Sequence, residues 1–135
     1  MAENTVVKEQ LTEDMIEAGA LLTQKLDELG LPVTVAVWFF MPEINEWRLL
    51  FASPSVAAEG PRAVYRQIKT AIDSLGPSAV SVPFSSIGLI DGNHLIVQLL
   101  KSALHTGPSV ARIRFSKNVI NGHFIDDALI YRSAA

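Results

Sequence analysis

The chain has 135 residues, of which 49% are hydrophobic and 19% are charged, and its formal net charge is −3. It contains no cysteine, which excludes disulfide scaffolds, thiolate metal sites and cysteine nucleophiles and favours a reducing compartment. No stretch has the roughly 18 apolar residues that a membrane span needs, and the polar start lacks the pattern of a signal peptide. We therefore expect one cytoplasmic domain over residues 1–135.

Charge is unevenly spread along the chain. Residues 1–60 hold three basic and ten acidic side chains, whereas residues 61–135 hold eight basic and four acidic ones. This asymmetry can indicate a basic binding face or charge-complementary self-association, but more often it reflects one acidic helix at the surface.

The first predicted element is an amphipathic helix over residues 13–29. Apolar residues recur at helical spacing there, Thr12 fits an N-cap, and Gly30 followed by Pro32 ends the helix. Residues 33–41 are nearly all apolar and predict a central strand that is buried on both faces. A turn at residues 42–45 then leads into a second strand, which forms a hairpin with the first.

The second half predicts two more helices and three more strands. Pro61 fits the first position of a helix that ends before Gly76, and residues 86–90 read as an edge strand because Pro83 precedes them. Asn93 can cap a third helix, which Gly107 and Pro108 close. Residues 111–120 and 123–132 flank Asn121-Gly122, the dipeptide best suited to a two-residue hairpin turn.

The resulting fold class is α+β. Three helices pack on a five-stranded mixed, mostly antiparallel sheet in the order αββαβαββ. Three helices can cover one side of such a sheet, yet residues 33–41 are apolar on both sides. Because contiguous exposed apolar patches are rare on monomers, a second copy of the chain, a different partner or a ligand groove should account for the other side. A second copy is the simplest of these, which predicts a homo-oligomer, most simply a dimer. The residues predicted for that interface are Trp38, Phe40, Leu50, Ile125 and Leu129.

Weak candidates for catalysis lie where the edge strand meets the third helix. Asp91 and His94 stand there beside a helix N-terminus, after Ser85 and Ser86, and could act as acid-base groups on an anionic substrate. The alternative is that Asp91-Gly92-Asn93 only turns the chain and caps the helix, since these are the usual turn and cap residues.

The terminal hairpin supplies candidates for ligand binding. Its basic and aromatic side chains could hold a phosphate backbone and stack on a base. A solvated strand face with ion pairs to Asp126 and Asp127 explains the same residues, and the sequence pI of about 5.5 argues against nucleic acid. The candidates are Arg112, Arg114, His123 and Tyr131, with Lys117 and Arg132 beside them.

Metal and cofactor sites are not predicted. Strand alternation places His123 and Asp127 on one face and Asp126 on the other, so at most two ligands converge. The sequence has no glycine-rich phosphate loop, serine nucleophile elbow or zinc-binding helix. We expect a small non-catalytic binding domain that acts as a homo-oligomer, and the alternatives are an enzyme for a phosphorylated or nucleotide substrate and nucleic-acid binding by the hairpin.

Overall fold

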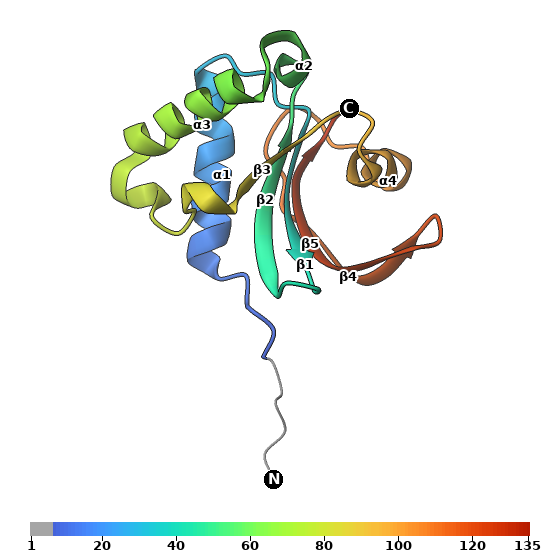
Figure 1. Ribbon diagram of the computed structural model, residues 1–135. Helices are drawn as coiled ribbons and strands as arrows, with labels where there is room; N and C mark the ends of the chain where they lie inside the picture. The colour runs from blue at the N-terminus through green and yellow to red at the C-terminus, as the bar shows by residue number, and fades with distance from the viewer. Residues whose placement is uncertain (1–6) are drawn as a thin grey trace.

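A computed structural model describes residues 7–135 of the chain (Figure 1). The helices of this part are α1 (Glu13–Glu28), α2 (Ser55–Glu59), α3 (Pro61–Leu75) and α4 (Leu95–Ala103), with short 3₁₀ turns η1 (Gly76–Ala79) and η2 (Phe84–Ser86). The strands are β1 (Val35–Met41), β2 (Glu46–Ala52), β3 (Ile87–Ile90), β4 (Ile113–Ile120) and β5 (His123–Ser133). They form one sheet in the order β3-β2-β1-β5-β4, in which only β3 runs parallel to its neighbour. The predicted fold class is confirmed.

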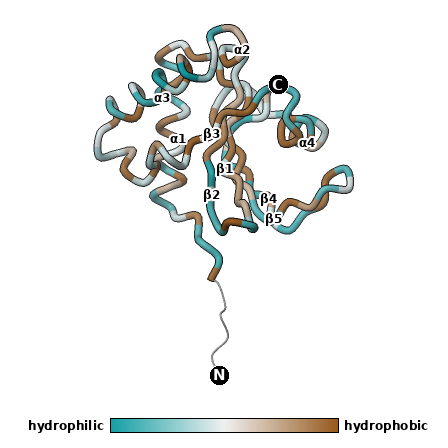
Figure 2. The backbone as a smooth tube through the Cα atoms, in the orientation of Figure 1, coloured by the Kyte–Doolittle hydropathy of each residue, from teal (hydrophilic) through white to brown (hydrophobic). Residues whose placement is uncertain are grey.

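The helices lie on both sides of the sheet (Figure 1). One apolar cluster joins α1 and α3 to the Trp38 face of β1, and a second joins α4 to the Val37 face. The expectation that the helices cover one side only is therefore wrong, since α4 covers the second face of β1. Figure 2 shows the hydrophobic colour running along these strands between the two helical layers.

Helix α1 forms as predicted because its end signals are local. The Thr12 hydroxyl accepts a hydrogen bond from the Met15 amide at 3.1 Å, and Gly30 has a φ of 84°. The Leu31 amide then donates to the Leu26 carbonyl at 3.0 Å, which satisfies a free carbonyl of the last turn. These bonds fix both ends of the helix.

A buried hydrogen-bond chain joins α1 to the sheet. The Trp38 indole donates to the Tyr131 hydroxyl at 2.9 Å, and that hydroxyl donates to the Ile16 carbonyl at 2.7 Å. Gly19 faces the same two rings, and a Cβ at this position would stand 2.7 Å from Trp38 Nε1 and also overlap the Tyr131 hydroxyl. The absence of a side chain at Gly19 lets the helix lie this close to the sheet.

Helix α4 differs from its predicted form at both ends. The N-cap is His94, whose Nδ1 accepts from the Ile96 amide at 3.1 Å, and Asn93 lies one residue outside. The helix stops at Ala103, earlier than Gly107 suggested, because Leu104 is already extended at φ −158° and ψ 134°. The Thr106 amide then bonds to the Ser133 carbonyl at 2.8 Å, so the chain leaves the helix to run beside β5.

The hairpin of β4 and β5 has the predicted turn and register. Asn121 and Gly122 both have positive φ, and Ile120 pairs with His123, Phe115 with Ala128 and Ile113 with Ile130. The predicted assignment of side chains to faces holds at the base of the hairpin only.

A reversal of faces occurs at Lys117. This residue has a φ of 48°, and its pairing with Asp126 is missing from the ladder. Ile120 and Ile125 therefore join the α4 cluster, whereas strict alternation places Ile125 on the same face as Leu129 and Tyr131.

Each edge of the sheet is interrupted at one point. At β3 the outward Leu89 amide donates to the Tyr65 hydroxyl at 3.2 Å, and at β4 the left-handed Lys117 interrupts the straight run of the strand. Separately, no helix within residues 7–135 has the length and apolar character required to cross a membrane.

Candidate functional site

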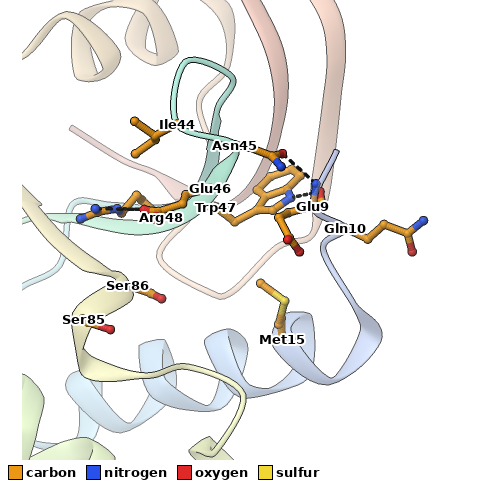
Figure 3. Close-up of a pocket in the computed structure, with 10 residues that line it drawn as sticks. All are labelled: Glu9, Gln10, Met15, Ile44, Asn45, Glu46, Trp47, Arg48, Ser85 and Ser86. Carbon is orange, nitrogen blue, oxygen red and sulfur yellow. Dashed lines mark hydrogen bonds and ion pairs between the residues drawn. The ribbon is translucent and has the colours of Figure 1, made fainter. Parts of the chain in front are cut away.

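A cavity lies at the end of the sheet where β1 turns into β2 (Figure 3). Its volume is about 620 Å³, and Ser85 and Ser86 of η2 lie across it from Glu9 and Trp47. The guanidinium of Arg48 is bound to Glu46 at 3.1 Å, so the open polar groups are the serine hydroxyls and Glu9. The full lining is Glu9, Gln10, Met15, Ile44, Asn45, Glu46, Trp47, Arg48, Ser85 and Ser86.

One wall of this cavity is an extended segment, residues 7–12, which we call the strap. The Asn45 side-chain amide accepts from the Glu9 amide at 2.9 Å and donates to the Val7 carbonyl at 3.0 Å, which imitates a strand pairing. The Trp47 indole donates to the Glu9 carbonyl at 2.9 Å. Asn45 can present its amide this way because it sits at a φ of 51°, which asparagine tolerates better than most residues.

Two further hollows continue the cavity on either side. A hollow of about 460 Å³ lies across the strap and shares Glu9, Gln10 and Trp47 with the first. Another of about 500 Å³ lies between α3 and η2 and shares Ser85 with the first. The three hollows share lining residues at this end of the molecule, and we refer to them together as the groove.

An ion cluster closes the strap end of the groove. The Asp127 carboxylate accepts from Arg114 at 2.6 and 2.7 Å, from Ser116 at 2.8 Å and from Lys8 at 3.0 Å. Burial by itself raises the pKa of Asp127, but the bonds from Arg114, Lys8 and Ser116 outweigh it and hold this pKa well below its usual range. The Arg114 guanidinium also lies 5.4 Å from the centre of the Trp47 ring.

The predicted acid-base candidates lie outside the groove. Asp91 accepts a bond from the Asn93 amide at 2.8 Å, and His94 caps α4 through Nδ1, so both have the turn and cap roles of the alternative interpretation. Asp91 lines a separate cavity of about 260 Å³ with Ala52, the last residue of β2, whereas Arg114 lies over Trp47 near its start. Five residues along a strand span about 16 Å, so the two predicted groups do not share a cavity.

The predicted ligand-binding residues of the hairpin do not converge. Arg112 is bound to Glu17 at 2.8 Å and Arg114 to Asp127, while His123 is exposed at the turn. Tyr131 is fully buried, and this burial raises the pKa of its hydroxyl far above the ordinary value. It cannot stack on a ligand, because α1 covers this face of the sheet. The prediction overlooked this cover. Arg132 is buried as well, in an ion pair with Asp27 at 2.7 Å.

The five residues predicted for an interface do not share one face. Trp38, Phe40 and Leu129 belong to the cluster beneath α1 and α3, whereas Leu50 and Ile125 belong to the cluster beneath α4. All five are at most 5% exposed. Their apolar character reflects burial within the chain.

The groove offers groups that can bind a ligand. Within residues 7–135 no three His, Asp or Glu side chains gather as a metal site would require. The groove combines open hydroxyls, an aromatic floor and charged ends, which suits hydrogen bonding and apolar contact with a ligand.

Sequence reasoning missed the strap and the hollow beside α3. The strap depends on a contact with Asn45, which lies 36 residues after Glu9. A local sequence pattern does not indicate a contact between residues so far apart. In this hollow Tyr65 of α3 lies against Phe84, and the centres of the two rings are 5.8 Å apart. The one signal in the sequence was an aromatic residue directly after Pro83, and the structure shows that this Phe84 is exposed.

Comparison with known proteins gives no relative. No family model, no curated protein and no solved structure matches this chain.

Proposed function

We propose that the chain is a non-catalytic interaction domain that acts in the cytoplasm as a homo-oligomer, most simply a dimer. The observation that carries this is an exposed apolar pair at the tip of the last hairpin. Val119 and Phe124 pair across β4 and β5 and are 61% and 62% exposed. Their neighbours Ile120 and Ile125 are buried beneath α4, so the tip is firmly held while its outer side is apolar.

A second source of apolar contact is the part of the sheet that α4 leaves half open. Phe39, Met41 and Phe115 pack on the α4 cluster and are only partly buried. Because each sheet edge is interrupted at one point, association through side-chain faces is favoured over strand addition. A symmetric contact between two hairpin tips, with Val119 and Phe124 at its centre, is the simplest arrangement.

The two alternative functions have less support. An enzyme that combines Asp91 and His94 with the hairpin arginines would need these groups in one cavity, and Asp91 and Arg114 line different ones. Nucleic-acid binding would need several free cations on the hairpin, but Arg112, Arg114 and Arg132 are each bound to a carboxylate. Among the described residues this leaves one exposed lysine of the hairpin, Lys117, outside an ion pair.

Light scattering after size-exclusion chromatography tests this proposal. At micromolar concentration the wild-type chain is expected to have twice the mass of one chain or more, and Phe124→Asp is expected to be monomeric, because it places a charge at the centre of the contact. The matched control is Val80→Asp, which changes an 80% exposed apolar residue after η1 and leaves the mass unchanged. A monomeric wild-type protein contradicts the proposal.

A further inference from the structure

The hollow between α3 and η2 is an apolar slot on the surface. Its volume is about 500 Å³, and its lining is Pro61, Arg62, Tyr65, Phe84, Ser85 and Ile87. Phe84 stands edge-on to Tyr65 at an interplanar angle of 76° and remains 39% exposed. Two rings, a proline and an isoleucine therefore form walls for an apolar side chain.

A hydrogen bond at the sheet edge fixes one wall of the slot. The Tyr65 hydroxyl accepts from the Leu89 amide of β3 at 3.2 Å, so the ring is fixed at its far end as well as at the helix. A slot that exists before binding avoids the entropic cost of ordering its walls, which favours affinity.

The rim of the slot is cationic. Arg62 lines it, and Arg66 follows one turn later on the exposed side of α3. Among residues 7–135 neither arginine takes part in an ion pair, whereas Lys69 on the next turn is bound to Asp73 at 3.1 Å. The slot lining contains no carboxylate, whereas the adjoining cavity holds Glu9 and Glu46. The negative charge of a ligand is therefore complemented at the slot itself.

The slot adjoins a second cavity. It shares Ser85 with the cavity in front of Trp47, and that cavity continues along Ser86 to Arg48. We propose that this part of the groove docks an extended acidic peptide segment of another protein. An apolar side chain of the peptide packs in the slot against the touching rings of Tyr65 and Phe84, a neighbouring carboxylate binds Arg62, and the peptide backbone runs past the two serines.

This site is separate from the surface proposed for self-association, although it rests on the chain being an interaction domain. The slot lies at the β3 edge of the sheet and the hairpin tip belongs to β4 and β5, and three strands other than β3 precede β4 in the sheet order. The peptide site is therefore expected to work in the Phe124→Asp variant as well.

Selection from a phage-displayed library of random linear peptides, with the full chain immobilised, tests the proposal. Enriched peptides are expected to carry a large apolar residue beside Asp or Glu. The enriched peptide is then synthesised with a fluorescent label, and its affinity is measured by polarisation. Arg62→Glu and Phe84→Ser are each expected to weaken binding about tenfold. The control is Lys101→Glu, which reverses an exposed charge on α4 and is expected to leave the affinity for the peptide unchanged.

A charge swap makes the test specific. A peptide whose acidic residue is replaced by lysine should bind Arg62→Glu better than it binds the wild type, which a merely structural role of Arg62 would not produce. Circular dichroism of each variant checks that the fold is intact. The proposal is overturned if no peptide is enriched, if the enriched peptides lack acidic residues, or if Arg62→Glu binds them as tightly as Lys101→Glu does. Peptide binding that survives in Phe124→Asp separates this outcome from the oligomeric state.

Discussion

Four hydrogen bonds converge on the Asp127 carboxylate, and they tie three separate parts of the chain together. Arg114 and Ser116 come from β4 and Lys8 comes from the strap. Since these donors hold the pKa of Asp127 below its value in the unfolded chain, the carboxylate stabilises the fold wherever it is ionised.

The Asp127→Asn variant tests this contribution. It is expected to lower the free energy of unfolding by about 2 kcal/mol at neutral pH, because hydrogen bonds to a charged acceptor are lost. A depressed folded-state pKa gives stability that is complete above about pH 5 and is lost as the pH falls below about 4. In urea unfolding, the difference in the free energy of unfolding between the wild type and Asp127→Asn should therefore become smaller in acid. The control Asp73→Asn, in an exposed ion pair, should cost under about 0.5 kcal/mol, and a difference independent of pH would contradict the assignment.

Gly19 provides a second test at the scale of one residue. Alanine normally favours a helix over glycine by about 1 kcal/mol, but here its Cβ would overlap the Tyr131 hydroxyl and crowd Trp38. Gly19→Ala is therefore expected to destabilise the protein by about 2 kcal/mol in thermal or urea unfolding. Gly92→Ala is the control, because nothing lies within 4 Å of its added Cβ. A Gly19→Ala protein that is more stable than the wild type would refute the close approach.

At the scale of elements, the strap is held by side chains and not by a strand ladder. Asn45 supplies two of its bonds, and Trp47 and Lys8 supply the others. Asn45→Gly keeps the backbone conformation at a positive φ and removes both amide bonds. We expect hydrogen exchange at the Glu9 amide to rise about tenfold, as the loss of about one net hydrogen bond implies. Asn93→Gly should leave that rate unchanged, and equal rates in the two variants would show that Asn45 does not hold the strap.

The elements with local signals could be predicted from the sequence. Thr12 and Gly30 bound α1, Pro61 begins α3, and Asn121-Gly122 turns the last hairpin, because each of these residues acts on its own backbone. The side of the sheet on which α4 packs could not be predicted, since helical periodicity indicates a buried stripe but not the face it meets. The face reversal at Lys117 was also hidden, because a lysine in the left-handed region has no sequence signature.

The candidate site was less accessible to prediction than the fold. Asp91 and His94 were singled out for catalysis, and their side chains are used to turn the chain and cap α4. The groove instead depends on contacts between distant segments, such as Tyr65 with Phe84. Only the tertiary arrangement creates those surfaces, so composition and spacing could not indicate them.

At the scale of the whole molecule, the sheet separates two cores that have β1 in common. Ile68 of α3 lies in one cluster and Ile130 of β5 in the other, and both side chains are fully buried. Mutations in the two cores should act independently, because the side chains lie on opposite sides of the sheet.

A double-mutant cycle measures this independence. Ile68→Val and Ile130→Val should each cost about 1 kcal/mol in urea unfolding, and their sum should match the double variant within about 0.5 kcal/mol. Both variants should keep one cooperative transition, since the shared strand couples the two layers. Two separate transitions in the double variant would show that the layers unfold as independent units.

The two tryptophans of the chain sit in places that make them natural optical probes. Trp38 is wholly inside, with its indole bonded to the tyrosine that holds α1 in position. Trp47 lies under the strap, bonded to its backbone and flanked by the cations of Lys8 and Arg114. Indole emission moves to longer wavelength when water reaches the ring, so one fluorophore reports the seating of the helix and the other the seating of the strap. The native protein thus carries, without any label, two intrinsic fluorophores, one at the contact of α1 with the sheet and one at the strap.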